Sequence, residues 1–165
     1  TSTQDKKSLC IERICDAKAA SGKTYDQLSA IMGLTNAFVA NLFTLQAQLS
    51  PRAAALLKVA VPGISAADLI TMQKCPVRSF EPALMQDPLV YRLVEAMQMY
   101  GLGLSHLVTE KKGDGIISAI DMFVTLDMVK GKAGEDRFAL TVNGKFLPHL
   151  EQMTENNTAA TGQAK

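Results

Sequence analysis

The sequence predicts an α+β protein, with helices in its first half and strands near its end. The first half holds a series of short apolar segments, and most follow a residue that favours the start of a helix. In the second half, the even positions from Ile116 to Met128 are apolar except for Ser118. Alternation with a period of two over this length is typical of a strand with one buried face. A hydroxyl on such a face needs a hydrogen-bond partner, from the backbone or from a ligand.

Start signals divide residues 1–75 into a predicted bundle of short helices. Thr24 and Gln27 match the capping-box pattern, in which two side chains satisfy the first free backbone N–H groups. Ser50 followed by Pro51 is a second strong start, because proline suits the first helical position. The expected helices cover residues 5–20, 24–33, 37–43 with Thr35 or Asn36 as the cap, 51–60, and 66–73 with Ser65 before its start.

The second and third of these helices have the spacing of a helix-turn-helix. The positions concerned are Leu28, Ile31, Gly33, Phe38 and Val39. Binding of DNA by such a motif requires polar and basic side chains on the second helix. Residues 35–43 contain no Lys or Arg, so we expect the pair to serve packing and expect no nucleic-acid partner. An interaction module of this type, without catalysis, is the alternative to an enzyme.

The second half predicts a linker, a helical segment, a hairpin and a tail. Residues 76–87 contain two prolines and form the linker, and residues 88–150 form the second domain. Asp87 and Pro88 begin a helix that Gly101 should end, and a further helix should cover residues 104–111. Strands are expected at 116–129 and 137–142, joined by a polar turn at 130–136. Asn143 and Gly144 are the dipeptide preferred for a two-residue hairpin turn, which residues 145–148 should follow. Residues 151–165 are polar and are predicted to be a disordered tail.

The helix that begins at Asp87 is apolar on nearly every side. Its polar residues Arg92, Glu95 and Gln98 are three apart. A helix of this kind is buried on most sides, and so small a domain cannot cover it, so we expect partner subunits. A desolvated arginine needs an anion. The spacing leaves two interpretations open: Glu95 alone supplies that anion, or Arg92 also faces a pocket for an anionic substrate.

Composition excludes several classes of protein. The chain has 165 residues and a net charge of +1, which gives no electrostatic argument for nucleic acid or an anionic membrane. No apolar run approaches the roughly 20 residues that a membrane-spanning helix needs. The first residues have no signal-peptide core, so a cytoplasmic protein is expected. Two histidines far apart and three cysteines without paired spacing predict no metal site.

Three segments carry a resemblance to the cyanase family, also called cyanate hydratase or cyanate lyase. They are DPLVYRLVEAMQMYG at 87–101, EKKGDGIISAIDM at 110–122 and NGKFLP at 143–148. The resemblance implies an N-terminal bundle of helix-turn-helix type and a C-terminal catalytic and dimerisation domain with intertwined strands. It also implies a homodecamer, built as a pentamer of dimers, with active sites shared between subunits.

The resemblance also implies a reaction and the residues that carry it. Cyanate would react with bicarbonate, a co-substrate, to give carbamate and carbon dioxide without a metal or organic cofactor. Such a reaction would serve cyanate detoxification or nitrogen use. The family's catalytic residues fall on Arg92, Glu95 and Ser118, and its substrate-binding positions fall on Ile116, Ala119 and Leu147.

Overall fold

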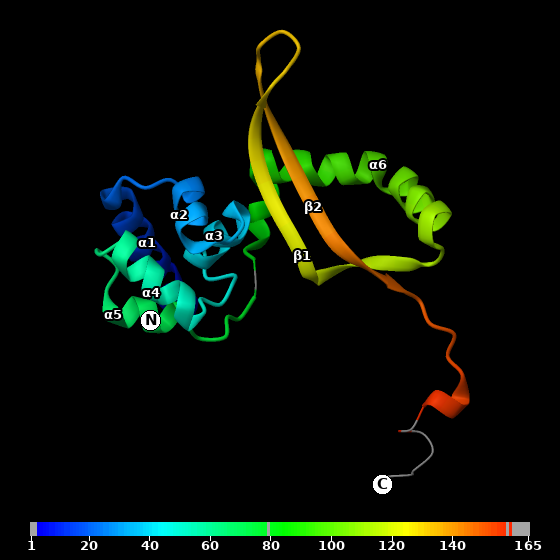
Figure 1. The fold of residues 1–165 in the computed structure, drawn as a ribbon, viewed down its shortest axis with the longest axis horizontal. Coiled ribbons are helices and arrows are strands. Elements are labelled where there is room, and N and C mark those ends of the chain that lie inside the picture. Colours follow the sequence, from blue (N-terminus) through cyan, green and yellow to red (C-terminus); the bar gives the residue numbers. More distant parts are fainter. Residues whose placement is uncertain (1–2, 79, 158, 160–165) are drawn as a thin grey trace. The chain divides into compact units, whose positions relative to one another are not determined.

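The computed structural model describes residues 3–78, 80–157 and 159. Helices make up its first half, and one long helix followed by a two-stranded hairpin makes up most of its second half (Figure 1). The chain divides into two compact units: unit 1 is Thr1–Glu81 with Phe123–Asn143, and unit 2 is Pro82–Met122 with Gly144–Lys165. The elements are α1 (Thr3–Ser21), α2 (Tyr25–Met32), α3 (Asn36–Phe43), α4 (Pro51–Ala60), α5 (Ala66–Met72), η1 (Pro82–Gln86), α6 (Pro88–Lys112), β1 (Gly115–Lys130), β2 (Asp136–Pro148) and η2 (Thr154–Asn156).

Helices α2 to α5 begin at the caps that the sequence predicts. The backbone N–H of Gln27 donates to the Thr24 hydroxyl over 3.1 Å, and the Gln27 side chain accepts from the N–H of Thr24 over 2.9 Å. This reciprocal pair confirms the capping box. The Ser50 hydroxyl accepts from the N–H of Ala53 in the same way, and Thr35 is the residue that caps α3. Each bond satisfies a backbone donor that a helix start would otherwise leave free.

The core of unit 1 lies between its five helices. The Phe43 side chain has no exposed surface, and the ring of Tyr25 meets it edge-on with centroids 5.7 Å apart. Such close packing of apolar side chains is the main favourable contribution to folding. The largest fully buried side chains are Phe43, Ile14, Leu28, Met32, Leu42, Leu49, Leu57, Met72, Val39 and Val61.

One buried carboxylate ties the first helix of the bundle to the last. Asp68 is 4% exposed and accepts from Nε and Nη2 of Arg13 over 3.1 and 2.5 Å, and also from Ser65 and the Cys10 thiol. The bonds from Arg13 are the main reason that the pKa of Asp68 falls to about 2. Burial is the main reason that the pKa of the Cys10 thiol rises to about 11. The carboxylate therefore stays charged and the thiol stays protonated at neutral pH.

Helix α6 is continuous, so the predicted end at Gly101 and the separate helix after it are wrong. Asp87 caps its start as expected, because its carboxylate accepts from the N–H groups of Leu89 and Val90. A glycine inside a helix costs only about 1 kcal/mol relative to alanine, so Gly101 alone does not stop it. The helix ends at Gly113, whose φ of +84° lies in the region that favours glycine.

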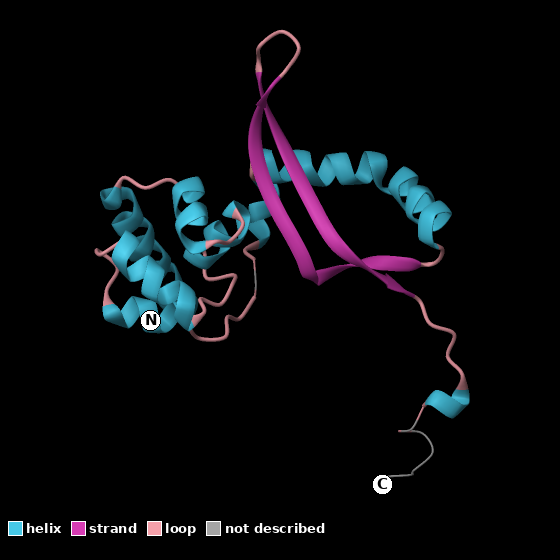
Figure 2. Ribbon diagram, viewed as in Figure 1, coloured by secondary structure: helices cyan, strands magenta, loops and turns pink. Residues whose placement is uncertain are grey.

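The strands β1 and β2 pair along a long hairpin whose turn lies at residues 131–135 (Figure 2). The N–H of Gly131 donates to the carbonyl of Glu135 over 2.8 Å, and Gly134 takes a φ of +83°. β1 has 16 residues and β2 has 13, so the two strands have nearly matched lengths.

Asn143 and Gly144 lie inside β2, so the predicted turn at this dipeptide is wrong. The turn predicted at 130–136 is confirmed, and β2 continues from it through this dipeptide while paired with β1. Gly144 has a different role. A Cβ atom at this position would lie 2.0 Å from Cγ2 of Ile117 and 3.1 Å from the carbonyl oxygen of Ser118. The glycine lets the two strands lie close together beside Ser118.

The predicted buried face of β1 is exposed in the single chain. Ile120 is 99% exposed, and Ser118 is the one residue of this described strand that is buried. The reason is that a two-stranded sheet has no second layer here to cover it. The 3-10 turn η2 lies in the predicted disordered tail, whose residues 158 and 160–165 fall outside the described part.

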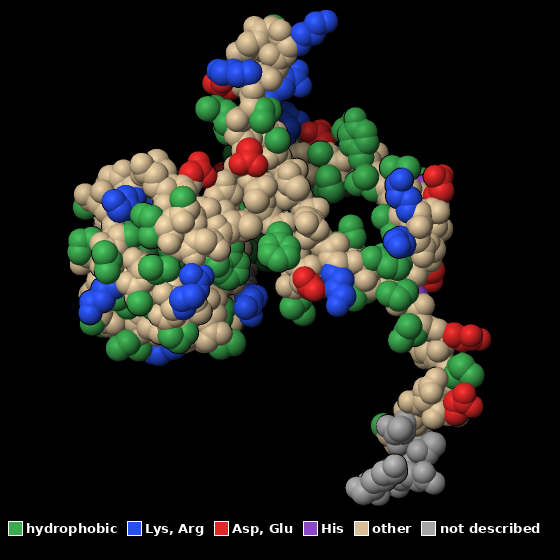
Figure 3. Space-filling model, viewed as in Figure 1, with side chains coloured by type: hydrophobic (Ala, Val, Ile, Leu, Met, Phe, Trp, Pro, Cys, Tyr) green, Lys and Arg blue, Asp and Glu red, His purple; other side chains and the backbone are tan. Residues whose placement is uncertain are grey.

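Apolar side chains are exposed along both the hairpin and α6, where Figure 3 shows them among polar groups. We call this set the open apolar surface. Among the described helices, none has the length and apolar character of a membrane span. In α6 the set consists of Leu89, Tyr91, Leu93, Met97, Met99, Tyr100, Leu102, Leu104 and Leu107, and in the hairpin it includes Ile116, Ile117, Ile120, Phe123, Leu126, Met128, Phe138, Leu140, Val142 and Leu147.

Candidate active site

The first turns of α6 hold Arg92 and Glu95 together. Nη1 of Arg92 donates to Oε2 of Glu95 over 2.5 Å, across the i,i+3 spacing of a helix. The Arg92 guanidinium also lies 5.9 Å from the ring centroid of Tyr91. The Arg92 side chain is 72% exposed, so within one chain it is not removed from water as the sequence predicts. The ion pair uses one of the five N–H donors of the guanidinium and leaves the others available to a ligand.

Ser118 of β1 is held by its own backbone. Its Oγ accepts from the N–H of Ile120 over 3.2 Å and from the N–H of Asp121 over 2.9 Å. A hydroxyl has two lone pairs and one proton, and these two bonds occupy both lone pairs. The group therefore retains only its proton for a ligand, and it can bind only an acceptor. The hydrogen-bond partner that the Ser118 hydroxyl needs on this apolar strand face is therefore the backbone.

The three predicted lining residues lie in the same unit as Ser118. Ile116 is 55% exposed, Leu147 is 39% exposed, and Ala119 is also exposed. The strands approach closely here, because a Cβ atom on Gly115 would lie 2.5 Å from the carbonyl oxygen of Leu147. The ends of β1 and β2 therefore bring Ile116 and Leu147 into one region of unit 2.

The single chain brings some of the predicted site together and leaves some of it apart. Arg92 and Glu95 are paired, and Ser118 lies on the strand between Ile116 and Ala119. Within the part of the chain that the structure describes, no hydrogen bond or ion pair joins Ser118 to Arg92 or Glu95. The described residues also contain no group of three or more His, Cys, Asp or Glu that could hold a metal ion.

Gly144 is a residue beside the site that the sequence interpretation missed. The signal was available in the sequence, because a glycine within a strand often marks a close approach of backbones.

We expect Gly144→Ala to lower the catalytic rate by about tenfold or more, because the added methyl group must displace Ile117 and the backbone at Ser118. Steady-state kinetics measure this effect. The matched control is Gly134→Ala, whose Cβ meets nothing within 4 Å but whose φ of +83° strains the turn. An effect on rate no larger than that of the control would contradict the prediction.

Comparisons with known proteins agree on one family. A family model described as the cyanate lyase C-terminal domain matches residues 82–151. Cyanate hydratase of Arabidopsis thaliana is 43% identical over 151 residues, which cover 92% of this chain and 90% of that protein. Cyanate hydratase of the Phaeodactylum tricornutum strain CCAP 1055/1 is also 43% identical, over 90% of this chain and 78% of that protein.

A solved structure confirms the fold. The crystal structure of cyanase from T. urticae matches with a TM-score of 0.71 and 28% identity, over 84% of this chain and 96% of that chain. The likeness confirms the predicted α+β class. Both halves of the chain lie within the matched length, and the identity of the relatives extends well beyond the C-terminal domain. The chain therefore belongs to the cyanate lyase family.

Proposed function

We propose that this chain is a lyase that decomposes cyanate with bicarbonate. In the proposed reaction, a bicarbonate oxygen attacks the cyanate carbon, and the bicarbonate proton goes to the cyanate nitrogen. The bond between the former bicarbonate carbon and the bridging oxygen then breaks and releases carbon dioxide. Transfer of a second proton to the nitrogen gives carbamate. Carbamate then takes up a further proton and breaks down to ammonia and carbon dioxide. Similarity to cyanate hydratases over most of the chain supports this assignment.

The proposed mechanism depends on the guanidinium group of Arg92, which is held by Glu95 on α6. Cyanate and bicarbonate are both anions, so bringing them together meets charge repulsion. A fixed cation lowers that repulsion, and more strongly as the surroundings become less polar. Arginine stays charged at any ordinary pH and can hold an anion with two parallel donors. Glu95 would hold the guanidinium in one orientation through their 2.5 Å contact.

Ser118 would add one directed hydrogen bond. Its lone pairs are occupied by the backbone of Ile120 and Asp121, so its proton would point to an oxygen or nitrogen of a substrate anion. Ile116, Ala119 and Leu147 would line the same pocket. The reaction as written transfers protons, forms and breaks one carbon–oxygen bond, and releases ammonia by breaking a carbon–nitrogen bond. It involves no oxidation or reduction, and we propose no metal or organic cofactor.

The open apolar surface supports a homo-oligomer. Exposed apolar patches of this extent are typical of surfaces that other chains cover. Helix α6 has no buried residue in the single chain, yet it carries both Arg92 and Glu95. We therefore propose that copies of this chain cover α6 and the hairpin, that the assembly is a decamer built from dimers, and that each site draws residues from more than one subunit. We propose a cytoplasmic location.

Bicarbonate dependence tests the reaction. We expect purified protein to release ammonia from cyanate at a rate that rises with bicarbonate concentration and then saturates. In buffer freed of carbon dioxide the rate should fall at least about 100-fold, because the attacking oxygen is then missing. The measurement is ammonia release at fixed cyanate, with formate replacing bicarbonate as the control anion. Full activity without bicarbonate would contradict the proposed reaction.

A helix-turn-helix module without catalysis is not favoured. The similarity to cyanate hydratases extends over 92% of the chain, including the bundle. The helix that would enter a DNA groove, α3, carries no Lys or Arg.

A further inference from the structure

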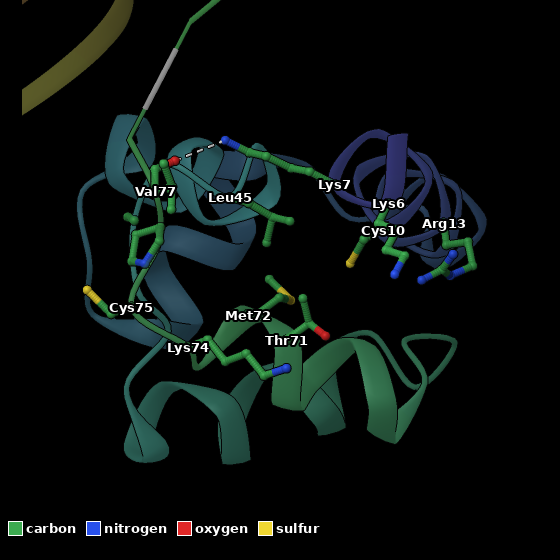
Figure 4. Close-up of a pocket in the computed structure, with 12 residues that line it drawn as sticks. Lys6, Lys7, Cys10, Arg13, Leu45, Thr71, Met72, Lys74, Cys75 and Val77 are labelled. Atoms are coloured by element: carbon green, nitrogen blue, oxygen red, sulfur yellow. Dashed lines mark hydrogen bonds between the residues drawn. The ribbon is translucent and has the colours of Figure 1, made fainter. Parts of the chain in front are cut away.

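A cavity of about 450 Å³ opens within unit 1, whereas the residues of the proposed active site belong to unit 2. Its walls come from α1, from the segment after α3, from the end of α5 and from the residues that follow α5 (Figure 4). This volume lies within the range of sites that bind small organic molecules. The proposed reaction makes no use of this cavity.

The rim of the cavity is cationic. Lys6, Lys7 and Arg13 come from α1, and Lys74 comes from the segment after α5. The described lining contains no Asp or Glu. Within the described part of the chain, no salt bridge joins Lys6 or Lys74 to a carboxylate, whereas Arg13 is paired with Asp68, which also accepts from the Cys10 thiol. The rim thus carries an excess of positive charge, although Asp68 offsets the charge of Arg13.

The floor of the cavity is apolar. The side chains of Leu45, Met72 and Cys10 point toward its interior in Figure 4. All three residues are at least 92% buried. Leu45 has a φ of 52° because it is the left-handed residue that ends α3: its N–H donates to the carbonyl of Leu42 over 3.3 Å, and the next N–H donates to the carbonyl of Asn41 over 2.9 Å.

One edge of the cavity is held in place by a rim cation. Nζ of Lys7 donates to the carbonyl of Val77 over 3.3 Å and ties α1 to the segment that runs past the opening. This bond uses one of the three donors of the ammonium group, and Arg13 likewise keeps donors beyond those that Asp68 accepts. The cations on this side are therefore positioned and still able to bind an anion.

We propose that this cavity binds a small organic anion, a carboxylate joined to an apolar chain. The carboxylate lies among the ammonium and guanidinium groups of the rim, and the apolar chain lies on Leu45, Met72 and Cys10. Because the rim is open to solvent, its attraction for the carboxylate is moderate and weakens with added salt. The proposal is independent of the reaction at Arg92.

Octanoate is a suitable probe, and octanol is its neutral counterpart of the same chain length. We expect calorimetric titration of the full-length protein to give a dissociation constant below about 1 mM for octanoate and at least tenfold weaker binding of octanol. The double variant Lys6→Gln with Lys74→Gln should weaken octanoate binding at least tenfold. The matched control Lys58→Gln removes a lysine of α4 outside the cavity and should leave binding unchanged. Should the double variant unfold, Lys74→Gln alone serves, because its side chain is exposed.

The variant Arg92→Leu separates this cavity from the active site. Octanoate binding that survives in Arg92→Leu and weakens in the lysine variant supports the cavity, whether or not the protein turns over cyanate. The proposal is overturned by an absence of octanoate binding, by equal binding of octanol, by binding that the lysine variant leaves unchanged, or by loss of binding in Arg92→Leu.

Discussion

Replacing Arg92 with leucine is expected to lower kcat/KM for cyanate decomposition by about 10²- to 10³-fold. The change removes the cation that would offset repulsion between two anions, and the loss of such a preorganised donor typically costs two to three orders of magnitude in rate. The arginine side chain is 72% exposed in the single chain, so its loss should leave the fold intact. Ammonia release in the presence of bicarbonate measures the activity, and circular dichroism checks the fold.

Arg137 provides the matched control. Its Nε donates to Glu135 over 2.7 Å, so it is also an exposed arginine in an ion pair. Arg137→Leu should keep activity within about twofold, because exposed pairs of this kind contribute little. An active Arg92→Leu protein would remove Arg92 from the proposed site, and an equal loss in Arg137→Leu would point to a general effect of losing a surface charge.

A mixture of two inactive variants extends this test to the shared site. If each site takes Arg92 and Ser118 from different subunits, an assembly of Arg92→Leu and Ser118→Ala chains contains some sites with both residues intact. Unfolding and refolding the two variants together should therefore restore part of the wild-type activity, while each variant treated alone stays inactive. Absence of any recovery from well-formed mixed oligomers would contradict the sharing of these two residues between subunits.

Phe43→Ala is expected to lower the free energy of unfolding by about 3–5 kcal/mol. Phe43 has no exposed surface and lies in the centre of the bundle, so the truncation loses apolar burial and leaves a cavity. Urea unfolding followed by circular dichroism, at one fixed protein concentration, measures the change.

Phe38 is the control for this measurement. It lies on the same helix as Phe43 but is 41% exposed. Phe38→Ala should therefore cost only about 1–2 kcal/mol, because less apolar surface returns to water. Equal costs for the two variants would contradict the placement of Phe43 at the centre of the core.

Local signals in the sequence predicted the starts of the helices well. The caps at Thr24, Ser50 and Asp87 form as expected, because each depends on bonds between residues two or three apart. The pairing of Arg92 with Glu95 follows from helical spacing for the same reason. These interactions need no information about distant parts of the chain.

The polar turn predicted at 130–136 is confirmed, but other turn signals failed where a longer element competed with them. Glycine often ends a helix, yet the backbone at Gly101 is helical because the residues on both sides favour one helix. Asn143 and Gly144 have the composition of a hairpin turn, yet they lie within β2 because β1 is long enough to pair with all of it. The strand pairing is decided by residues far apart in the sequence, so a dipeptide could not predict it.

The sequence by itself determined the helix starts, the ion pair on α6 and the family, and it supplied Arg92, Glu95 and Ser118 as the proposed site residues. Only the tertiary structure showed that both acceptor positions of Ser118 are occupied by its own backbone, and that the apolar faces of β1 and α6 are open in a single chain. The reason is physical. Periodicity shows which side chains share a face, but burial depends on what packs against that face, and a two-stranded hairpin supplies no covering layer of its own.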